Sequence, residues 1–406
     1  MSYILRCMNC GKEYKKNEIE YTCPCCGDRK GTLEIILRKK KLGRDDFSFY
    51  SKKGIWQFID LLPVETDSFF PPLEIGNTPL YKRDDIAQKF NIKEFYIKDD
   101  GKNPTASFKD RASALAVNKA YEKGYKTIFC ASTGNAASSL SGLCAASNLK
   151  SVIFVPEAAP EAKLAQLQIY GARVIKINGS YDKAFDISLE LGFKRNWYCR
   201  NSAINPYLLE GKKTCSLELA VQTSWKLPDV IFVSVGDGTV LSSFYKGFSD
   251  LKYFGLLDRI PKIIGVQAEN ASTLMKTYLN GEPFQCSDEN VSTVADSIAV
   301  GKPRDVYKAC KYTKKYGGSF ISVKDSEIVD AIFELSRSTG VFAEPAGATA
   351  YAGFKKYFQR EHSSKISAAV IVTGNGLKDL RTPLNHLKPL KVYNDIEEIK
   401  EDLDEN

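Results

Sequence analysis

The sequence lacks long hydrophobic runs and is poor in histidine. No apolar segment of its 406 residues approaches the roughly 20 residues that a membrane-spanning helix needs, so we expect no membrane. The opening stretch MSYILRCMNC has no apolar signal-peptide core, which favours a cytoplasmic location. The only two histidines, His362 and His386, lie outside every motif described below and are expected at the surface.

A strong charge of one sign is also absent. The net charge of +8 is modest for this length, and 43% hydrophobic with 26% charged residues is an ordinary globular composition. The basic RKKK at 38–41 and the acidic segment at 395–406 are therefore expected to be solvated surface. A chain of this length has room for two or three domains with cores of their own.

The cysteines are unevenly distributed. Five of the eleven lie in the first 26 residues, and a disulfide framework is not expected in a cytoplasmic chain. The segments CMNCG and CPCCG are two C-x-x-C-G knuckles, each closed by a glycine that tolerates a tight turn. Four thiolates match a closed tetrahedral zinc site without an open position, so we expect a structural role. The expected ligands are Cys7, Cys10, Cys23 and Cys26, with Cys25 as a spare thiol.

From about residue 78 the chain alternates short apolar runs with helical stretches. The apolar runs are rich in Ile and Val, as strands buried on both faces of a parallel sheet are. The alternation predicts a doubly wound α/β architecture with two sheets. The expected strands include 127–132, 151–156, 172–177, 229–236, 262–268 and 368–374.

Three of these strands run into small, polar, glycine-bearing loops: ASTGNAA, VGDGTVLSS and TGNGLKD. Ligands in such folds bind at the carboxyl ends of the strands. In VGDGT, two glycines let backbone N–H groups converge on the start of the next helix, which suits an anion. The loop is neither a Walker A motif nor a dinucleotide fingerprint, because no Gly-Lys-Ser/Thr follows and the third glycine is missing. In STGNA, hydroxyl and amide groups at a helix start suit a carboxylate.

The stretch NPTASFKDRAS, residues 103 to 113, places Lys109 at a helix start. Ser107 is expected to be the N-cap, with Asp110 as the acidic half of a capping box. The helix dipole disfavours an ammonium group in the first turn, so Lys109 should tend toward the neutral amine that attacks carbonyls. The alternative is that Lys109 and Asp110 are simply solvated. A nucleophilic lysine, an anion loop and a carboxylate loop together are what an amino-acid enzyme using pyridoxal phosphate needs.

With these motifs assembled, the chain resembles threonine synthase and its relatives among the fold-type II pyridoxal-phosphate enzymes. The matching segments run from GNTPL (76–80) to GNGLKD (374–379), about three quarters of the chain. Many relatives also begin with a cysteine knuckle pair. The resemblance implies a tryptophan synthase β-like fold with two doubly wound α/β domains and a small N-terminal zinc ribbon. The expected limits are 1–31 for the ribbon, 32–75 for a connector, 76–120 with 222–392 for the large pyridoxal-phosphate domain, 121–221 for the small domain and 393–406 for an acidic tail.

The resemblance also implies residue roles. Lys109 would hold pyridoxal phosphate as a Schiff base and then move protons at the substrate. Asn135 would hydrogen-bond the 3′-oxygen of the ring, and Thr373 would face the pyridine nitrogen. The implied cofactor-binding residues are Lys109, Asn135, Gly236, Asp237, Gly238, Thr239 and Thr373, and the implied substrate-binding residues are Ser132, Thr133, Gly134 and Ala136.

The chain departs from the family pattern at three positions. Leu208 in NPYLLEG stands where an arginine would bind the substrate phosphate, and such contacts are typically bidentate and strong. Lys212 or Lys213 is a candidate replacement. Ala136 stands where a threonine is usual, and Ala106 where a glycine is usual.

The implied reaction converts O-phospho-L-homoserine and water to L-threonine and phosphate, in a homodimer. Other β- or γ-elimination or replacement enzymes stay open, namely a serine or threonine ammonia-lyase and a cysteate-synthase-like enzyme. An alternative without catalysis is a nucleic-acid or protein interaction module built on the ribbon and RKKK. It is disfavoured, because aromatic residues are not interleaved with the basic run and the ribbon is acidic as well as basic.

Overall fold

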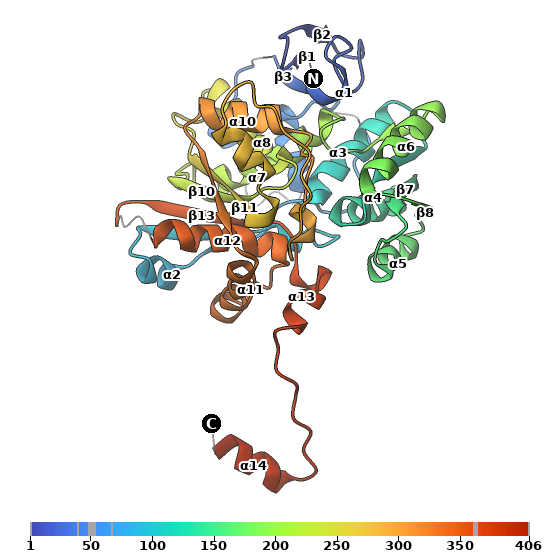
Figure 1. Cartoon of the computed structure of the whole chain (residues 1–406). Helices are drawn as coiled ribbons and strands as arrows, with labels where there is room; N and C mark the ends of the chain where they lie inside the picture. The colour runs from blue at the N-terminus through green and yellow to red at the C-terminus, as the bar shows by residue number, and fades with distance from the viewer. Residues whose placement is uncertain (1, 39, 48–53, 66–67, 360–363, 405–406) are drawn as a thin grey trace.

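The computed structural model contains three β-sheets with helices packed around the two larger ones (Figure 1). The predicted fold class is confirmed: two α/β units are accompanied by a small N-terminal antiparallel sheet that carries the cysteine cluster. The expected surface position of His362 and parts of the 32–75 connector fall outside the residues that the structure describes. The described residues are 2–38, 40–47, 54–65, 68–359 and 364–404.

The largest sheet has six strands in the order β12-β11-β10-β13-β5-β4. All pairs are parallel except β4 with β5. Every residue of the central strands β10 and β13 is buried, because Ile, Val, Phe and Ala side chains are covered on both faces. The strands are β4 (Leu80–Lys82), β5 (Glu94–Asp99), β10 (Val230–Ser234), β11 (Lys262–Ala268), β12 (Ser319–Val323) and β13 (Ser367–Val372).

Eight helices in the described part of the chain accompany this sheet. Among them, α7 is buried along nearly its whole length because it lies between α3 and α8. The helices are α2 (Asp84–Lys89), α3 (Lys109–Glu122), α7 (Tyr207–Gln222), α8 (Thr239–Tyr253), α9 (Thr273–Leu279), α10 (Val306–Lys315), α11 (Asp325–Thr339) and α12 (Pro345–Phe358).

The second sheet is parallel, in the order β8-β7-β6-β9, and has its own helices. The strands expected at 127–132, 151–156 and 172–177 are all present, and each of their ends lies within one residue of the expected position. The short β9 is an addition, since two residues carry no usable pattern. The elements are β6 (Thr127–Ala131), α4 (Asn135–Ala146), β7 (Lys150–Pro156), α5 (Glu161–Ile169), β8 (Arg173–Ile177), α6 (Tyr181–Lys194) and β9 (Tyr198–Cys199).

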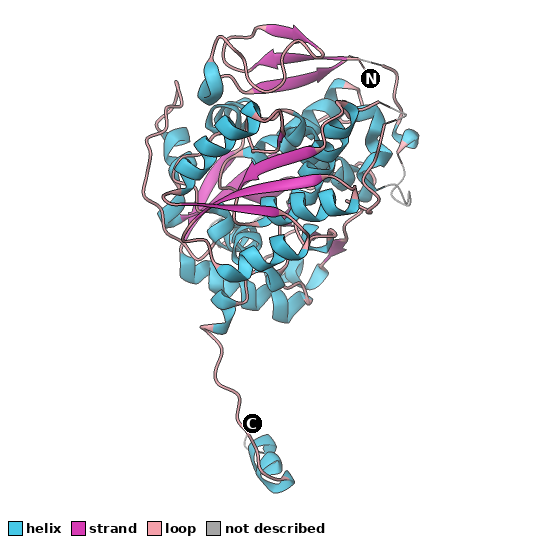
Figure 2. Cartoon of the chain, turned by 90° about the vertical axis from the view of Figure 1, so that its right-hand side faces the viewer, coloured by secondary structure: helices cyan, strands magenta, loops and turns pink. Residues whose placement is uncertain are grey.

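The N-terminal sheet lies at one end of the molecule, above the helices of the body (Figure 2). Its antiparallel strands are in the order β2-β1-β3. At the other end of the chain, α14 lies away from the body (Figure 1). None of the described helices has both the length and the apolar character needed to cross a bilayer. The terminal elements are β1 (Tyr3–Cys7), β2 (Glu13–Lys15), α1 (Gly27–Lys30), β3 (Leu33–Leu37), α13 (Arg381–Leu384) and α14 (Ile396–Asp404).

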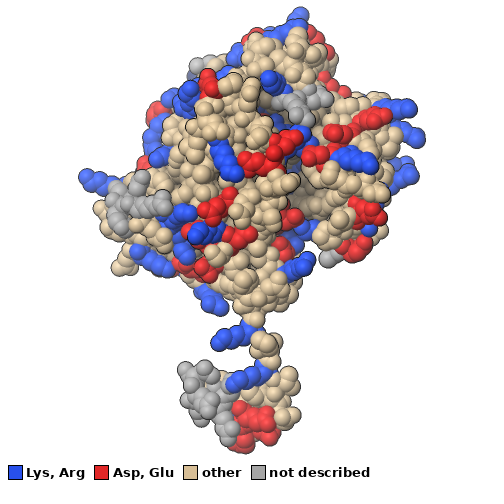
Figure 3. Space-filling view, viewed as in Figure 1, with Lys and Arg blue, Asp and Glu red and all other residues tan. Residues whose placement is uncertain are grey.

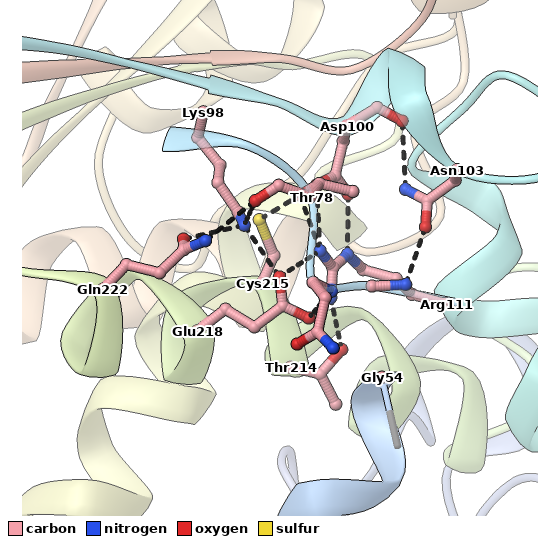
Figure 4. A network of polar contacts seen from close by, with 12 residues as sticks. Gly54, Thr78, Lys98, Asp100, Asn103, Arg111, Thr214, Cys215, Glu218 and Gln222 are labelled. Carbon is pink, nitrogen blue, oxygen red and sulfur yellow. Dashed lines mark hydrogen bonds and ion pairs between the residues drawn. The ribbon is translucent and has the colours of Figure 1, made fainter. Parts of the chain in front are cut away.

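A buried polar network joins α3 to α7 and to the end of β5 (Figure 4). Arg111 donates to the Asp100 carboxylate at 2.6 Å and, through both Nη atoms, to Glu218 at 2.7 and 2.8 Å. Lys98 donates to Glu218 Oε2 at 2.7 Å, the oxygen that also accepts from Arg111 Nη2. All four side chains are fully buried, and pairing each charge offsets the cost of removing it from water. The network thereby fixes α3, and with it Lys109, against α7.

Candidate active site

A cavity of about 700 Å³ opens where the strand ends of the two large sheets meet. It is lined by the loops after β6, β10 and β13 and by the first residue of α3, as expected for a ligand site at the carboxyl ends of strands. All eleven residues that the sequence implied for cofactor and substrate line this one cavity. They are Lys109, Ser132, Thr133, Gly134, Asn135, Ala136, Gly236, Asp237, Gly238, Thr239 and Thr373.

The start of α3 differs from the expected cap. The N-cap is Phe108 rather than Ser107, and it makes no side-chain cap hydrogen bond. Ser107 Oγ accepts from the Lys109 N–H at 3.3 Å, while the Asp110 carboxylate accepts from the backbone N–H of Thr105 at 2.7 Å. The predicted capping box between Ser107 and Asp110 is therefore wrong. The Asp110 side chain accepts from Thr105, two residues before Ser107.

The turn before this helix explains one departure from the family pattern. Ala106 adopts φ = 64°, in the left-handed region where a glycine is free of strain. The segment is held against the end of β13, because Phe108 N–H donates to the Thr373 carbonyl at 2.9 Å. Alanine at 106 thus keeps the turn that a glycine would make, at some cost in backbone strain.

Lys109 has an electrostatic environment that favours its neutral amine. Burial, and after it the positive charge of Arg200, lower the pKa of Lys109 from 10.5 to about 8. Glu344 and Asp237 raise that pKa in part. The pKa of Lys109 is lowered as predicted, but the main cause is burial and not the predicted effect of the helix dipole.

The loop after β6 leads directly into α4, whose first residue is Asn135. The Gly134 N–H donates to Ser132 Oγ at 3.2 Å, and Asn135 Nδ2 donates to Glu344 Oε1 at 2.8 Å. The first amides of this twelve-residue helix have no partner within the helix, so the loop can bind a carboxylate.

The loop after β10 forms the second helix start. Gly238 caps α8 with φ = 95°, a left-handed conformation that only glycine adopts without strain. The Asp237 carboxylate accepts from the Arg304 N–H at 2.6 Å, which fixes the loop. Lys212 Nζ donates to Thr239 Oγ1 at 2.7 Å. A helix N-terminus with an adjacent lysine is suited to a phosphate group.

Leu208 does not line the cavity. It is 1% exposed and belongs to the hydrophobic core that includes Ile55 and Leu115. Lys213 is buried in ion pairs with Glu210 and Asp250, so it is no replacement for the expected arginine. Lys212 does reach the site, at the loop of Thr239.

Glu344, Arg200 and Ser234 are among the cavity residues that the sequence did not indicate. Glu344 accepts from Asn135, and burial raises the pKa of Glu344. Arg200 and Ser234 each carry a buried polar atom without a hydrogen-bond partner in the described structure, Nη2 and Oγ respectively. The FAEPAGA segment could have indicated Glu344. No local pattern marked Arg200 or Ser234.

The N-terminal cysteines form a separate cluster. The Sγ atoms of Cys7, Cys10, Cys23 and Cys26 all lie within 4.8 Å of one another. Cys25 lies outside this group and is exposed. Four converging thiols are the donor set that fits a closed zinc site, so the cluster is compatible with a structural metal.

Comparisons with known proteins agree with this geometry. Residues 72–374 match the family described as "Pyridoxal-phosphate dependent enzyme". The threonine synthase of Methanocaldococcus jannaschii is 37% identical over 409 residues, covering 99% of this chain and all of that protein. The threonine synthase of Methanosarcina acetivorans is 37% identical, covering 98% of each chain.

Solved structures share the fold at low identity. Threonine deaminase isoform 2 from Solanum lycopersicum superposes with a TM-score of 0.66 at 22% identity, covering 86% of this chain and 98% of that one. O-ureido-L-serine synthase gives a TM-score of 0.67 at 17% identity, covering 78% and 95%. At these identities the likeness concerns the fold alone.

Proposed function

The chain belongs to the pyridoxal-phosphate-dependent enzyme family, and from this membership we propose that it is a threonine synthase converting O-phospho-L-homoserine and water to L-threonine and phosphate. The resemblance read from the motifs is confirmed by relatives that match over nearly the full chain. The observation that carries the proposal is the match at 37% identity together with a cavity that unites Lys109, a carboxylate loop and a phosphate loop.

The residues of the cavity fit pyridoxal phosphate. Lys109 supplies an amine with a lowered pKa, the first turn of α8 supplies amides for the phosphate, and the buried Oγ of Ser234 lacks a partner among the described residues. When bound, the cofactor supplies an electron sink for carbanions at the substrate. Lys109 would hold it covalently, and Gly236, Asp237, Gly238 and Thr239 would hold its phosphate. Asn135 would donate to its ring oxygen and Thr373 would face its ring nitrogen.

The same residues then act on the substrate. Ser132, Thr133 and Gly134, beside Ala136, would bind its carboxylate through hydroxyl and amide groups. Once released from the cofactor, the Lys109 amine would move protons at the α and β carbons, since its pKa of about 8 suits a general base near neutral pH.

Several finer features belong to the proposal. Zinc would be held by Cys7, Cys10, Cys23 and Cys26, the protein would be a cytoplasmic homodimer, and the domain limits would be those given above. The face in Figure 3 mixes acidic and basic side chains, which gives no support to a nucleic-acid-binding surface there.

The test is to incubate the cofactor-loaded protein with O-phospho-L-homoserine and to measure phosphate and L-threonine together. Equal amounts of both products are expected. Release of 2-oxobutanoate and ammonia from L-threonine, without phosphate release from the phosphorylated substrate, would move the function to an ammonia-lyase. Consumption of sulfite with O-phospho-L-serine would move it to a cysteate-synthase-like enzyme.

A further inference from the structure

Arg200 is a buried cation that makes no ion pair with any described carboxylate, although the charge of Asp110 acts on it from a greater distance. It follows β9, is 1% exposed and lines the cavity. Its Nε donates to Ser113 Oγ at 3.1 Å, but its Nη2 has no hydrogen-bond partner in the described structure. An unpaired buried charge is costly, so its presence beside Lys109 indicates that an anion completes the site.

Arg111 shows what a buried arginine looks like when its role is structural. It is also fully buried, yet it donates to the carboxylates of Asp100 and Glu218 (Figure 4). Arg200 is buried to the same extent, but it makes no ion pair with a described carboxylate. Both arginines are held at α3, since Arg111 belongs to this helix and Arg200 donates to its Ser113.

The other cations at the cavity are already engaged. Lys302 donates to Asp288 at 2.7 Å, and Arg304 donates to Asp182 at 2.8 Å. Lys212 donates to the loop proposed to hold the cofactor phosphate. Lys109 is the attachment point of the cofactor. Arg200 is therefore the cationic side chain of the described cavity that is left for a second anion.

We propose that Arg200 binds the phosphate group of O-phospho-L-homoserine, in place of the arginine absent at position 208. This inference rests on the proposed function. A guanidinium group offers parallel N–H donors that match phosphate oxygens, and a phosphate dianion would pair with the buried charge of Arg200. The assignment explains how the chain accepts a phosphorylated substrate although Leu208 lies in the core.

The test compares two ligands of the cofactor-loaded enzyme that differ only in the anion. The first is the phosphonate isostere of the substrate, in which a methylene replaces the bridging ester oxygen. The second is L-norvaline, the same amino acid without the phosphonate. Binding is followed by the change in visible absorption of the bound cofactor and by calorimetry, in wild type, Arg200→Gln, Arg200→Lys and the control Lys302→Gln.

Arg200→Gln should lose about tenfold to a hundredfold in phosphonate affinity, the range of a hydrogen bond to a charged group, with L-norvaline affinity kept within about twofold. Arg200→Lys should recover part of the loss, because it restores the charge without the fork. Lys302→Gln removes a charge that is already paired and should keep the preference for the phosphonate. Thermal unfolding and the cofactor absorption show that each variant is folded and loaded.

Equal losses for both ligands in Arg200→Gln would overturn the inference, since Arg200 would then support the cofactor or the fold. Unchanged phosphonate affinity in both Arg200 variants would overturn it as well, as would a wild type that binds the two ligands equally. A wild type that releases no phosphate from O-phospho-L-homoserine instead contradicts the proposed function, and this is seen before any variant is made.

Discussion

The phenol oxygen of Tyr21 accepts a hydrogen bond from the backbone N–H of Cys199 at 3.0 Å. Tyr21 lies between the two cysteine knuckles, and Cys199 directly precedes Arg200. The Tyr21 ring also packs on Phe193 and Tyr198, at centroid distances of 5.3 and 6.0 Å. The N-terminal module therefore supports the strand end that carries a cation of the cavity, which gives it a role in the site without any contact to the ligand.

Tyr21→Phe should weaken the site while leaving the module folded. The ring packing is kept, but the Cys199 N–H loses its acceptor, which costs about 1–3 kcal/mol for a buried donor. We expect a lower unfolding temperature and a severalfold loss of phosphonate affinity with the cofactor absorption retained. Tyr121→Phe is the control, because Tyr121 is 48% exposed and should give neither effect. Phosphonate affinity equal to wild type in Tyr21→Phe would show that the two regions are independent.

Cys7→Ser should remove zinc and loosen the N-terminal module. Cys7 is fully buried within the cluster, and a structural metal supplies folding free energy that serine cannot replace. The measurements are metal content by emission spectroscopy and thermal unfolding. Cys25→Ser is the matched control, since Cys25 is exposed and outside the cluster. A purified wild type without zinc that tolerates Cys7→Ser would contradict the assignment.

Leu208→Arg should unfold the protein rather than improve substrate binding. The side chain is 1% exposed in an apolar core, so an arginine there would be buried without a partner. The expected loss is at least about 3 kcal/mol in unfolding free energy, measured by denaturant titration. Leu208→Met conserves the volume and should cost less than about 1.5 kcal/mol. A stable Leu208→Arg variant with tighter phosphonate binding would show that position 208 can reach the cavity.

The fold was largely predictable because its signals are local. Runs such as VIFVS and SAAVIV are apolar on both faces, and that pattern suffices for a central parallel strand. Strand β5, with its mixed EFYIKD sequence, has no comparable signal. Its Lys98 is buried because it has an ion-pair partner on α7, more than a hundred residues away.

The site was predictable where a motif carries its own geometry. Gly236 and Gly238 predict the N-terminus of a helix, and α8 begins directly after Gly238. Arg200 could not be found in this way, because its significance lies in what is missing around it. The packing of Leu208 in the core was not predictable for the related reason that sequence position does not say which way a helical side chain faces. Both features depend on long-range packing.

Lys109 should control both cofactor attachment and its pH dependence. In the cofactor-free protein, attachment of added pyridoxal phosphate requires the neutral amine, so its rate should rise with pH around a midpoint near 8. Because burial and Arg200 depress the pKa from 10.5, the unfolded chain binds more protons between about 8 and 10.5. The unfolding free energy of the cofactor-free protein should therefore rise with pH across this window.

Two variants separate these causes. Lys109→Ala should abolish the visible absorption of attached cofactor and all turnover while keeping the fold, and its unfolding free energy should lose the Lys109 part of the rise. Arg200→Gln should move the attachment midpoint upward, since a positive neighbour that opposed protonation is gone. Stopped-flow absorption across pH 6 to 10 measures cofactor attachment in both variants, and denaturant titration measures the unfolding free energy. Turnover retained in Lys109→Ala would refute its role, and an unmoved midpoint in Arg200→Gln would place the cause of the depressed pKa in burial alone.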